Sequence, residues 1–128
     1  MQRFLVISTF LGLLLAMVSS LAMAEDSSQN YRNQAGSTMT LYISDRGEIT
    51  GSYTTALGCG VGIDRSLVGW KNGNAITFIV NFGECGSLTS WVGHIQDNGD
   101  IVTIWTLARG GESWDAKLTG TSTFMPIK

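Results

Sequence analysis

Proline and histidine are almost absent from this 128-residue chain, which contains one of each, Pro126 and His94. Charged residues are also scarce, at 14% of the sequence. A single imidazole, without the His/Cys spacing typical of a metal site, excludes the usual transition-metal centres. A Gly-x-Ser-x-Gly turn and a phosphate-binding glycine loop are missing too, and the acidic residues gather at turns. These absences argue against an enzyme, a resident cofactor and a bound metal.

The first residues have the organisation of an export signal. Arg3 supplies a small basic region, residues 4–18 are largely apolar, and residues 22–24 form a small-residue cleavage site. A membrane helix is the alternative, but a serine pair ends the apolar run and no basic stop-transfer flank follows it. We therefore predict a cleaved signal peptide at residues 1–24 and a secreted or periplasmic domain at residues 25–128. No membrane segment is expected in the mature chain.

The mature chain is mildly acidic and contains both cysteines. Cleavage would remove one of the eight basic residues and none of the ten acidic ones, which leaves seven against ten, a net charge of −3. A nucleic-acid partner is therefore disfavoured. Cys59 and Cys85 would both reach an oxidising compartment, where an even number of cysteines favours pairing. We predict a Cys59–Cys85 disulfide, with two separate thiols as the alternative.

Glycine is abundant, with 16 residues, and the glycines separate short segments in which apolar and polar residues alternate. Such alternation between turn residues is typical of antiparallel strands, and residues 45–47, 71–74 and 97–99 predict tight hairpins. The longest connection, residues 56–65, is glycine-rich and has the character of a lid. We therefore predict an all-β fold, an eight-stranded antiparallel up-and-down (meander) β-barrel. Its strands are expected at residues 31–33, 38–44, 48–55, 66–71, 75–82, 87–96, 100–108 and 114–125.

Polar side chains are expected inside this barrel. Strand residues two apart point the same way, so Tyr53 shares a face with Thr55, and Trp91 shares one with Ser87 and Thr89. A buried hydroxyl without a partner costs roughly 1–3 kcal/mol. Several inward-facing hydroxyls in one barrel therefore indicate a polar ligand.

The outer face of the predicted barrel is more apolar than a solvated surface should be. Trp70, Ile79, Val92 and Ile104 fall on it by strand parity. His94 also falls on this face, which removes the one candidate base from the ligand site. A second copy of the chain would cover an apolar face that is otherwise an aggregation liability. We predict a subunit interface there, with scattered surface hydrophobes as the alternative.

Several short segments, taken in order, resemble the avidin and streptavidin family of biotin-binding proteins across essentially the whole mature chain. They are Asn33-Gln-Ala-Gly-Ser-Thr38, Ile49-Thr-Gly-Ser-Tyr-Thr-Thr-Ala56, Leu67-Val-Gly69, Thr89-Ser-Trp-Val-Gly93, Ile104-Trp-Thr-Leu107, Trp114 and Thr123-Phe124. Each segment alone is weak, but the ordered set is specific. The cysteine pair is similar to that of the disulfide-bearing, rhizavidin-like dimeric branch. The resemblance implies a barrel that holds the ureido ring of biotin and needs no cofactor.

The resemblance implies a role for each polar residue at the ureido end. The ureido oxygen would accept hydrogen bonds from Asn33, Ser37 and Tyr53. Several fixed donors in a dry site suit an oxygen that carries partial negative charge, because each hydrogen bond gains strength at low dielectric. Thr55 would accept a hydrogen bond from one ureido N–H.

The remaining parts of biotin also have expected partners. Thr89 would approach the ring sulfur, and the carboxylate would meet Ser87 and backbone N–H groups of the lid near Cys59. An apolar wall would exclude water from the ring. Its expected members are Trp91, Trp105, Phe82, Leu107 and Leu57.

Three positions depart from the family pattern. Phe82 stands where the best-known members carry a tryptophan, which makes one stacking wall smaller, and Ala35 replaces a larger residue. Ser122 stands where they carry an Asp or Asn that receives the second ureido N–H, and a serine hydroxyl is shorter and uncharged. We therefore expect Ser122 to contact the ligand, and biotin to bind more weakly than in the strongest members.

Trp114 aligns with the tryptophan by which tetrameric members contact the ligand of a neighbouring subunit, and the dimeric branch usually lacks it. Trp114 is therefore a candidate intersubunit ligand contact. We expect a homo-oligomer, with a dimer favoured over a tetramer. Two alternative functions are a lipocalin-like carrier of another small ligand and a barrel with a filled interior that binds protein through its loops. The many inward hydroxyls disfavour the lipocalin-like site, which would be mostly aliphatic.

Overall fold

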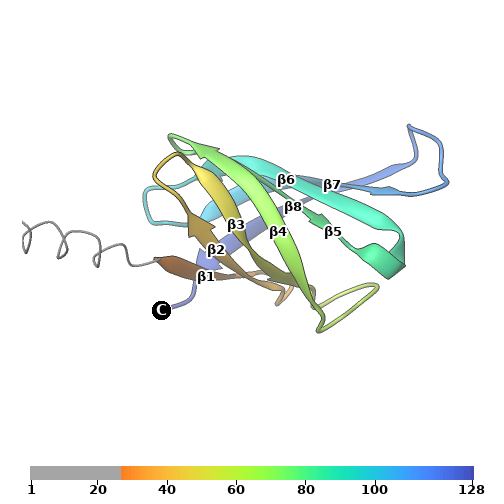
Figure 1. Ribbon diagram of the computed structural model, residues 1–128, viewed down its shortest axis with the longest axis horizontal. Helices are drawn as coiled ribbons and strands as arrows, with labels where there is room; N and C mark the ends of the chain where they lie inside the picture. The colour runs from red at the N-terminus through yellow and green to blue at the C-terminus, as the bar shows by residue number, and fades with distance from the viewer. Residues whose placement is uncertain (1–26) are drawn as a thin grey trace, which may run out of the picture.

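Eight antiparallel strands form a closed barrel in the computed structural model, which describes residues 27–128 (Figure 1). The predicted signal peptide at residues 1–24 lies outside the described residues. The strand order follows the chain, so the predicted up-and-down β-barrel is confirmed. A 3₁₀ turn, η1 (Gly83–Cys85), lies between β5 and β6. The strands are β1 (Ser28–Asn33), β2 (Thr38–Ile43), β3 (Glu48–Thr54), β4 (Asp64–Asn72), β5 (Ala75–Asn81), β6 (Ser87–Ile95), β7 (Ile101–Arg109) and β8 (Lys117–Pro126).

The barrel closes at β1, which pairs with both β2 and β8. Five residue pairs join β1 to β2, whereas three join it to β8. Those three include Asn33 opposite Phe124 and Tyr31 opposite Pro126. Pro126 lies at the end of β8, where a residue without an N–H is tolerated in a ladder. Closure removes the free edges that would otherwise pair with other chains.

Tight hairpins occupy one end of the barrel at the predicted turns. The connections β2–β3, β4–β5 and β6–β7 contain Gly47, Gly73 and Gly99, whose φ angles are 84°, 60° and 91°. Positive φ is the conformation that these hairpin turns require and that glycine adopts without strain. Ile49 and Ile101 follow two of these turns and are almost fully buried. The aliphatic core therefore fills the hairpin end of the barrel.

Four aromatic rings lie between this aliphatic core and the other end. Phe124 is fully buried and contacts Tyr53, Phe78 and Trp91, with ring centroids 6.5, 5.7 and 6.3 Å away. Phe78 stacks on Trp91 at 5.2 Å, and Tyr53 leans against the same indole at 4.9 Å. Such aromatic pairs stabilise a fold by about 0.5–1.5 kcal/mol beyond the burial of their surface. They give the open end of the barrel a rigid base.

Eleven of the sixteen strand ends differ from the predicted ones, by one to three residues, and β4 and β7 extend to include Arg65 and Arg109. β3 ends one residue early, so Thr55 belongs to the following loop, and β5 likewise ends before Phe82. β1 begins three residues earlier than predicted, at Ser28. β8 begins three residues later, at Lys117, because a hydrogen-bonded turn precedes it.

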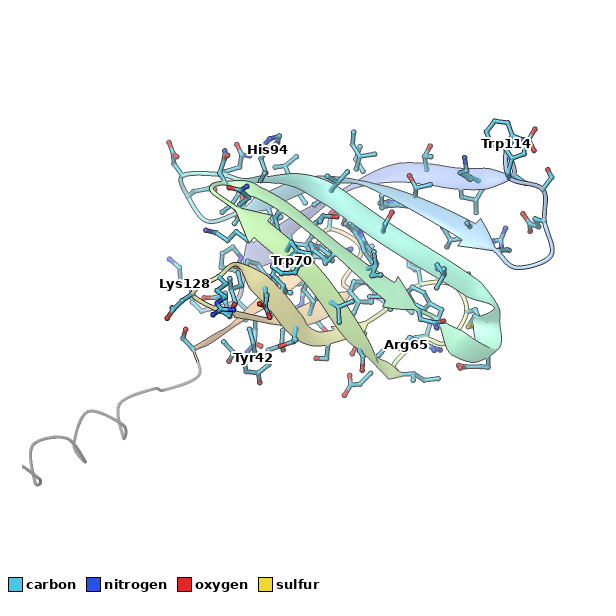
Figure 2. All side chains as sticks on the ribbon, turned by 45° about the horizontal axis from the view of Figure 1, so that its top comes forward. Tyr42, Arg65, Trp70, His94, Trp114 and Lys128 are labelled. Atoms are coloured by element: carbon cyan, nitrogen blue, oxygen red, sulfur yellow. A yellow bond between two sulfur atoms is a disulfide. The ribbon has the colours of Figure 1, made fainter. Side chains whose placement is uncertain are left out.

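The outward side chains of β4 to β7 are apolar, as predicted. Trp70, Ile79, Val92 and Ile104, here called the outer patch, are each at least 50% exposed in the single chain, and Trp70 is labelled in Figure 2. Val92 lies directly opposite Ile104 in the β6–β7 ladder, so these two members of the patch are adjacent. His94 is exposed on the outside of β6, away from the interior, as strand parity predicted.

Residues 27–128 contain no helix with the length and hydropathy that a membrane crossing requires. Over the same residues, no group of three or more His, Cys, Asp or Glu side chains is placed to hold a metal ion.

Candidate ligand-binding site

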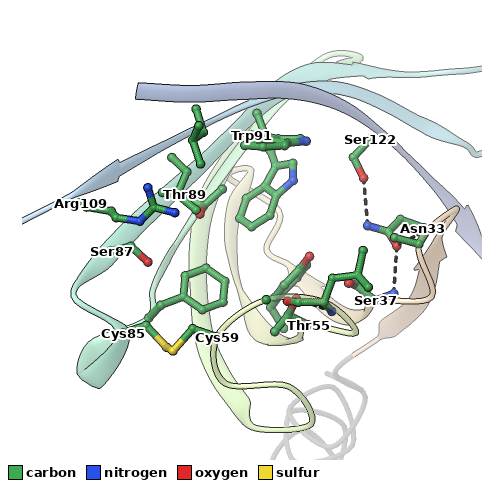
Figure 3. Close-up of a pocket in the computed structure, with 18 residues that line it drawn as sticks. Asn33, Ser37, Thr55, Cys59, Cys85, Ser87, Thr89, Trp91, Arg109 and Ser122 are labelled. Atoms are coloured by element: carbon green, nitrogen blue, oxygen red, sulfur yellow. Dashed lines mark hydrogen bonds between the residues drawn. A yellow bond between two sulfur atoms is a disulfide. The ribbon is translucent and has the colours of Figure 1, made fainter. Parts of the chain in front are cut away.

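A cavity of about 370 Å³ lies at the end of the barrel opposite the tight hairpins, and Figure 3 shows the residues that line it. Residues that are up to 89 positions apart in the sequence meet there, because the odd-numbered strands end and the even-numbered strands begin beside the cavity. All thirteen predicted ligand-binding residues line this cavity: Asn33, Ser37, Tyr53, Thr55, Leu57, Cys59, Phe82, Ser87, Thr89, Trp91, Trp105, Leu107 and Ser122. The other lining residues are Ala35, Gly58, Cys85, Arg109 and Leu118.

The side chain of Asn33 is oriented by the turn that follows β1. Its Oδ1 accepts hydrogen bonds from the backbone N–H groups of Ala35, at 3.1 Å, and of Ser37, at 2.9 Å. This Asx turn uses the amide oxygen and leaves the amide nitrogen for other partners. Nδ2 donates to the Ser122 hydroxyl at 3.0 Å (Figure 3). The second N–H of this buried amide remains available to an acceptor on a ligand.

Ser37 and Thr55 have opposite hydrogen-bonding characters. The Oγ of Ser37 accepts a hydrogen bond from the Ala56 N–H at 2.9 Å, so its own O–H is free to donate. The Oγ1 of Thr55 donates to the Leu57 carbonyl at 2.7 Å and accepts from the Leu57 N–H at 3.2 Å. The Thr55 proton is therefore already used, and a lone pair is left for a ligand. Ser37 is a donor and Thr55 an acceptor.

Tyr53 adds a third donor. Its side chain is 5% exposed, and burial raises its pKa above the ordinary value of 10.0, although the hydroxyls of Ser37 and Thr55 offset part of that rise. The phenol therefore stays protonated at neutral pH. Three donors, on Asn33, Ser37 and Tyr53, thus face the same cavity as the acceptor on Thr55.

Ser122 is buried in β8 and completes this polar group. Its hydroxyl accepts the hydrogen bond from Asn33, and its backbone carbonyl accepts one from the Thr103 hydroxyl at 2.8 Å. The backbone position is therefore fixed, and the hydroxyl keeps one proton and one lone pair for other partners. Because this position carries a hydroxyl, no carboxylate lines the cavity.

Aromatic side chains form the apolar wall of the cavity. Trp91 is 3% exposed, Phe82 is also buried, and Trp105 is partly exposed toward the cavity. Trp105 packs directly on the backbone of Gly120, its partner in the β7–β8 ladder. A Cβ atom at position 120 would lie 2.5 Å from the indole, which is well inside van der Waals contact. Glycine at this position therefore allows Trp105 to lie where it does.

The loop at residues 55–63, here called the lid, borders the cavity and is tied to η1. The predicted disulfide is present, with Cys59 Sγ 2.05 Å from Cys85 Sγ and the two Cα atoms 6.0 Å apart. Cys59 and Leu57 bring the lid to the cavity, and Cys85 lies two residues before Ser87. The disulfide therefore holds two loops of the cavity rim in a fixed relation.

Arg65 supports the same two loops, and the sequence analysis missed it. Its side chain is 7% exposed, and its two terminal nitrogens donate to the Glu84 carboxylate at 3.2 and 2.5 Å. The guanidinium carbon lies 5.2 Å from the centre of the Phe82 ring, and Gly60 of the lid packs directly on Nη2. Hydrogen bonding from Arg65 lowers the pKa of the Glu84 carboxyl group. The one available signal was the inward parity that Arg65 shares with Leu67.

Two other lining residues, Arg109 and Leu118, were also missed. Strand parity could have identified both, because Arg109 is two residues after Leu107 and Leu118 is four residues before Ser122. Arg109 is the one charged residue among those that line the cavity.

Trp114 does not line the cavity of its own chain. It is 83% exposed in the β7–β8 connection, and the Lys117 ammonium lies 5.0 Å from the centre of its ring. Figure 2 shows it at the end of that long hairpin, pointing away from the barrel. Its role as a contact to the ligand of a neighbouring subunit stays a prediction.

Comparison with known proteins gives consistent matches over the barrel. The model of the avidin family matches residues 22–127. A relative, afifavidin of Afifella pfennigii, is 36% identical over an alignment that covers 87% of this chain and 84% of afifavidin. Apo shwanavidin superposes with a TM-score of 0.72 at 32% identity, over 82% of this chain and 98% of that one. A rhizavidin–biotin complex gives a TM-score of 0.71 at 34% identity, over 79% of this chain and 100% of that one.

Proposed function

The chain belongs to the avidin family, and we propose that it binds biotin in the barrel cavity without catalysing a reaction. The observation that carries this proposal is the set of three donors, on Asn33, Ser37 and Tyr53, beside the acceptor on Thr55. A cyclic urea presents the complementary groups, one carbonyl oxygen and two N–H groups. The rhizavidin structure, to which this fold is similar, contains biotin.

The ureido ring would lie against the polar group. Its oxygen would accept from the three donors, one N–H would donate to Thr55, and the second N–H would face Ser122. Donors that are fixed before binding cost little reorganisation and act strongly where water is excluded. A neutral serine opposite the second N–H makes a weaker hydrogen bond than a carboxylate would. We therefore expect the affinity to be lower than that of a family member with an acidic residue there.

The rest of biotin would lie along the apolar wall. Trp91, Trp105 and Phe82 would pack against the bicyclic ring, and Thr89 would lie near the sulfur atom. The acyl chain would run toward Ser87 and the lid. A lipocalin-like carrier finds no support in this cavity, because a fully apolar ligand would leave the fixed donors and the acceptor without partners, which costs free energy.

Calorimetric titration of the folded, oxidised protein with biotin tests the proposal. Tyr53→Phe removes one hydroxyl and keeps the ring, so the affinity should fall by about tenfold or more, since an unsatisfied buried partner costs about 1–3 kcal/mol. Tyr42→Phe, the same change at an exposed position on β2, should leave the affinity unaltered. Absence of binding at excess biotin would sink the proposed function. An unaltered affinity in Tyr53→Phe would sink the role of Tyr53.

The outer patch supports a homo-oligomer, with a dimer favoured over a tetramer. Four large apolar side chains at least half exposed form a surface that a second copy would cover. Sedimentation of the full protein should give the mass of a dimer, and Val92→Asp should shift it toward the monomer. Val61→Asp changes an equally exposed valine on the lid and should keep the dimer. A monomeric mass for the unmodified protein would contradict this assignment.

Export completes the proposal. A cleaved signal at residues 1–24 would place the barrel in the periplasm or outside the cell, where the disulfide at the cavity rim can form and persist. N-terminal sequencing of the protein recovered from these compartments should begin at or near Glu25. A protein recovered with residues 1–24 intact would contradict cleavage.

A further inference from the structure

Arg109 gives one side of the cavity a positive charge. The seventeen other lining residues are neutral, including the three donors and the acceptor assigned to the ureido ring. A neutral hydrogen-bonding group on one side and a cation on the other suit a ligand whose two ends differ in charge. The guanidinium therefore has the placement of a group that recognises the end of the ligand remote from the urea.

Strand pairing places Arg109 beside Ser87. The two residues lie directly opposite each other in the β6–β7 ladder, and Arg109 is the last residue of β7. It shares the inward parity of Leu107, so its side chain leaves the strand toward the cavity. Figure 3 shows the guanidinium on the same side of the cavity as Ser87 and across from Asn33 and Ser122.

We propose that Arg109, together with Ser87, forms a subsite for the terminal carboxylate of the ligand, so that the protein discriminates the free acid from its neutral amides and esters. This inference rests on the proposed binding of biotin. A guanidinium can donate to both oxygens of a carboxylate through charge-assisted hydrogen bonds, whereas a serine donates one neutral hydrogen bond. The hydroxyl and the lid N–H groups can serve an acid or an amide. The charge of Arg109 favours only the acid.

Glu112 is the anion that competes for Arg109. One oxygen of its carboxylate lies 3.7 Å from Arg109 Nη1, and the two side chains are 39% and 50% exposed. An ion pair at this distance and exposure contributes little, because water and salt screen it. A ligand carboxylate that makes a bidentate contact can therefore replace it. Glu112 also repels such a carboxylate, so it weakens the preference that Arg109 creates.

Affinities for biotin and for biotinamide, which differ in their terminal charge, test the inference in the folded, oxidised protein. The unmodified protein should bind biotin about tenfold more tightly than the amide, which corresponds to about 1.4 kcal/mol. Arg109→Gln should remove most of this difference by weakening biotin alone. Glu112→Gln should strengthen biotin binding and leave the amide unaffected. Raising the salt concentration to about 0.5 M should likewise lower the affinity for biotin and leave that for biotinamide unchanged.

Arg46→Gln is the matched control, because it removes the same charge at the hairpin end of the barrel, and both affinities should stay unaltered. Equal affinities for biotin and biotinamide in the unmodified protein would overturn the inference while leaving the proposed function standing. An equal loss of affinity for both ligands in Arg109→Gln would also overturn the inference, since it would indicate that Arg109 has a structural role. Failure of both ligands to bind the unmodified protein would overturn the proposed function and this inference with it.

Discussion

Reduction of the Cys59–Cys85 disulfide is expected to lower the free energy of unfolding by about 3.5 kcal/mol. The two cysteines are 26 residues apart, and a bond across such a segment restricts the unfolded chain far more than the folded one. For a barrel of this size each kcal/mol corresponds to roughly 4–8 °C, so the melting temperature should fall by more than about 10 °C. Thermal and urea denaturation with and without reductant measure both quantities.

Reduction should also speed the release of biotin. Cys59 lies in the lid and lines the cavity, while Cys85 lies in η1, next to the segment that carries Ser87. Without the bond, the lid must be ordered when the ligand binds, and each ordered side chain costs about 0.5–1.5 kcal/mol. The dissociation rate constant should therefore rise by about tenfold, which stopped-flow displacement with excess unlabelled biotin can measure.

A double variant, Cys59→Ser with Cys85→Ser, separates loss of the bond from other effects of the reductant. It should match the reduced protein in stability and in release rate. Arg65 and Glu84 still hold η1 to β4, so the barrel should remain folded at room temperature. A melting temperature that does not change after complete reduction would contradict the stabilising role, and an unchanged release rate would contradict the role in ligand retention.

Phe124→Ala is expected to destabilise the barrel by about 3–5 kcal/mol, the usual cost of removing a fully buried aromatic ring. Phe124 has no exposed surface, and its ring contacts Tyr53, Phe78 and Trp91. It also faces Asn33 in the three-pair ladder by which β8 closes the barrel. The substitution therefore leaves a cavity at the base of the ligand site and weakens the closing contact. Chemical denaturation of the variant and of the unmodified protein measures this loss in the free energy of unfolding.

The same substitution should weaken biotin binding, because Tyr53 and Trp91 line the cavity and both rest on the Phe124 ring. Phe124→Leu keeps most of the buried volume, so it should lower the free energy of unfolding and the affinity for biotin much less. Met125→Ala is the adjacent control, since Met125 points outward and is 44% exposed, and its effect should stay within about 0.5 kcal/mol. If Phe124→Ala were as stable as Met125→Ala, the aromatic base would not be the structural element that we describe.

The strands and hairpins were predictable because their signals are local. Alternation of apolar and polar residues fixes which side chains point inward, and glycines such as Gly47 and Gly99 mark turns that need positive φ. Tyr53, Trp91 and their neighbours were placed in the site by parity combined with a family resemblance. The thirteen predicted ligand-binding residues line the cavity, whereas Trp114 does not, and all of their contacts with biotin stay predictions.

The residues that were missed are those whose importance depends on distant partners. Arg65 is an inward-facing cation in a barrel wall, and only the folded chain brings Glu84, Phe82 and the lid around it. Arg109 follows the inward parity of β7, but its position beside Ser87 depends on the β6–β7 register. The predicted start of β8 was wrong for a different, local reason, because backbone hydrogen bonds within residues 113–117 form a turn before the strand.

The sequence by itself determined the eight strands, the inward set of polar and aromatic side chains and the cysteine pair, because each depends on residue type and spacing along the chain. Only the tertiary structure decided the direction of the hydrogen bonds. Asn33 presents its nitrogen, Ser37 its proton and Thr55 a lone pair because of the backbone groups that folding places beside them. An amide or a hydroxyl can both donate and accept, and its neighbours in space settle which of the two remains for a ligand.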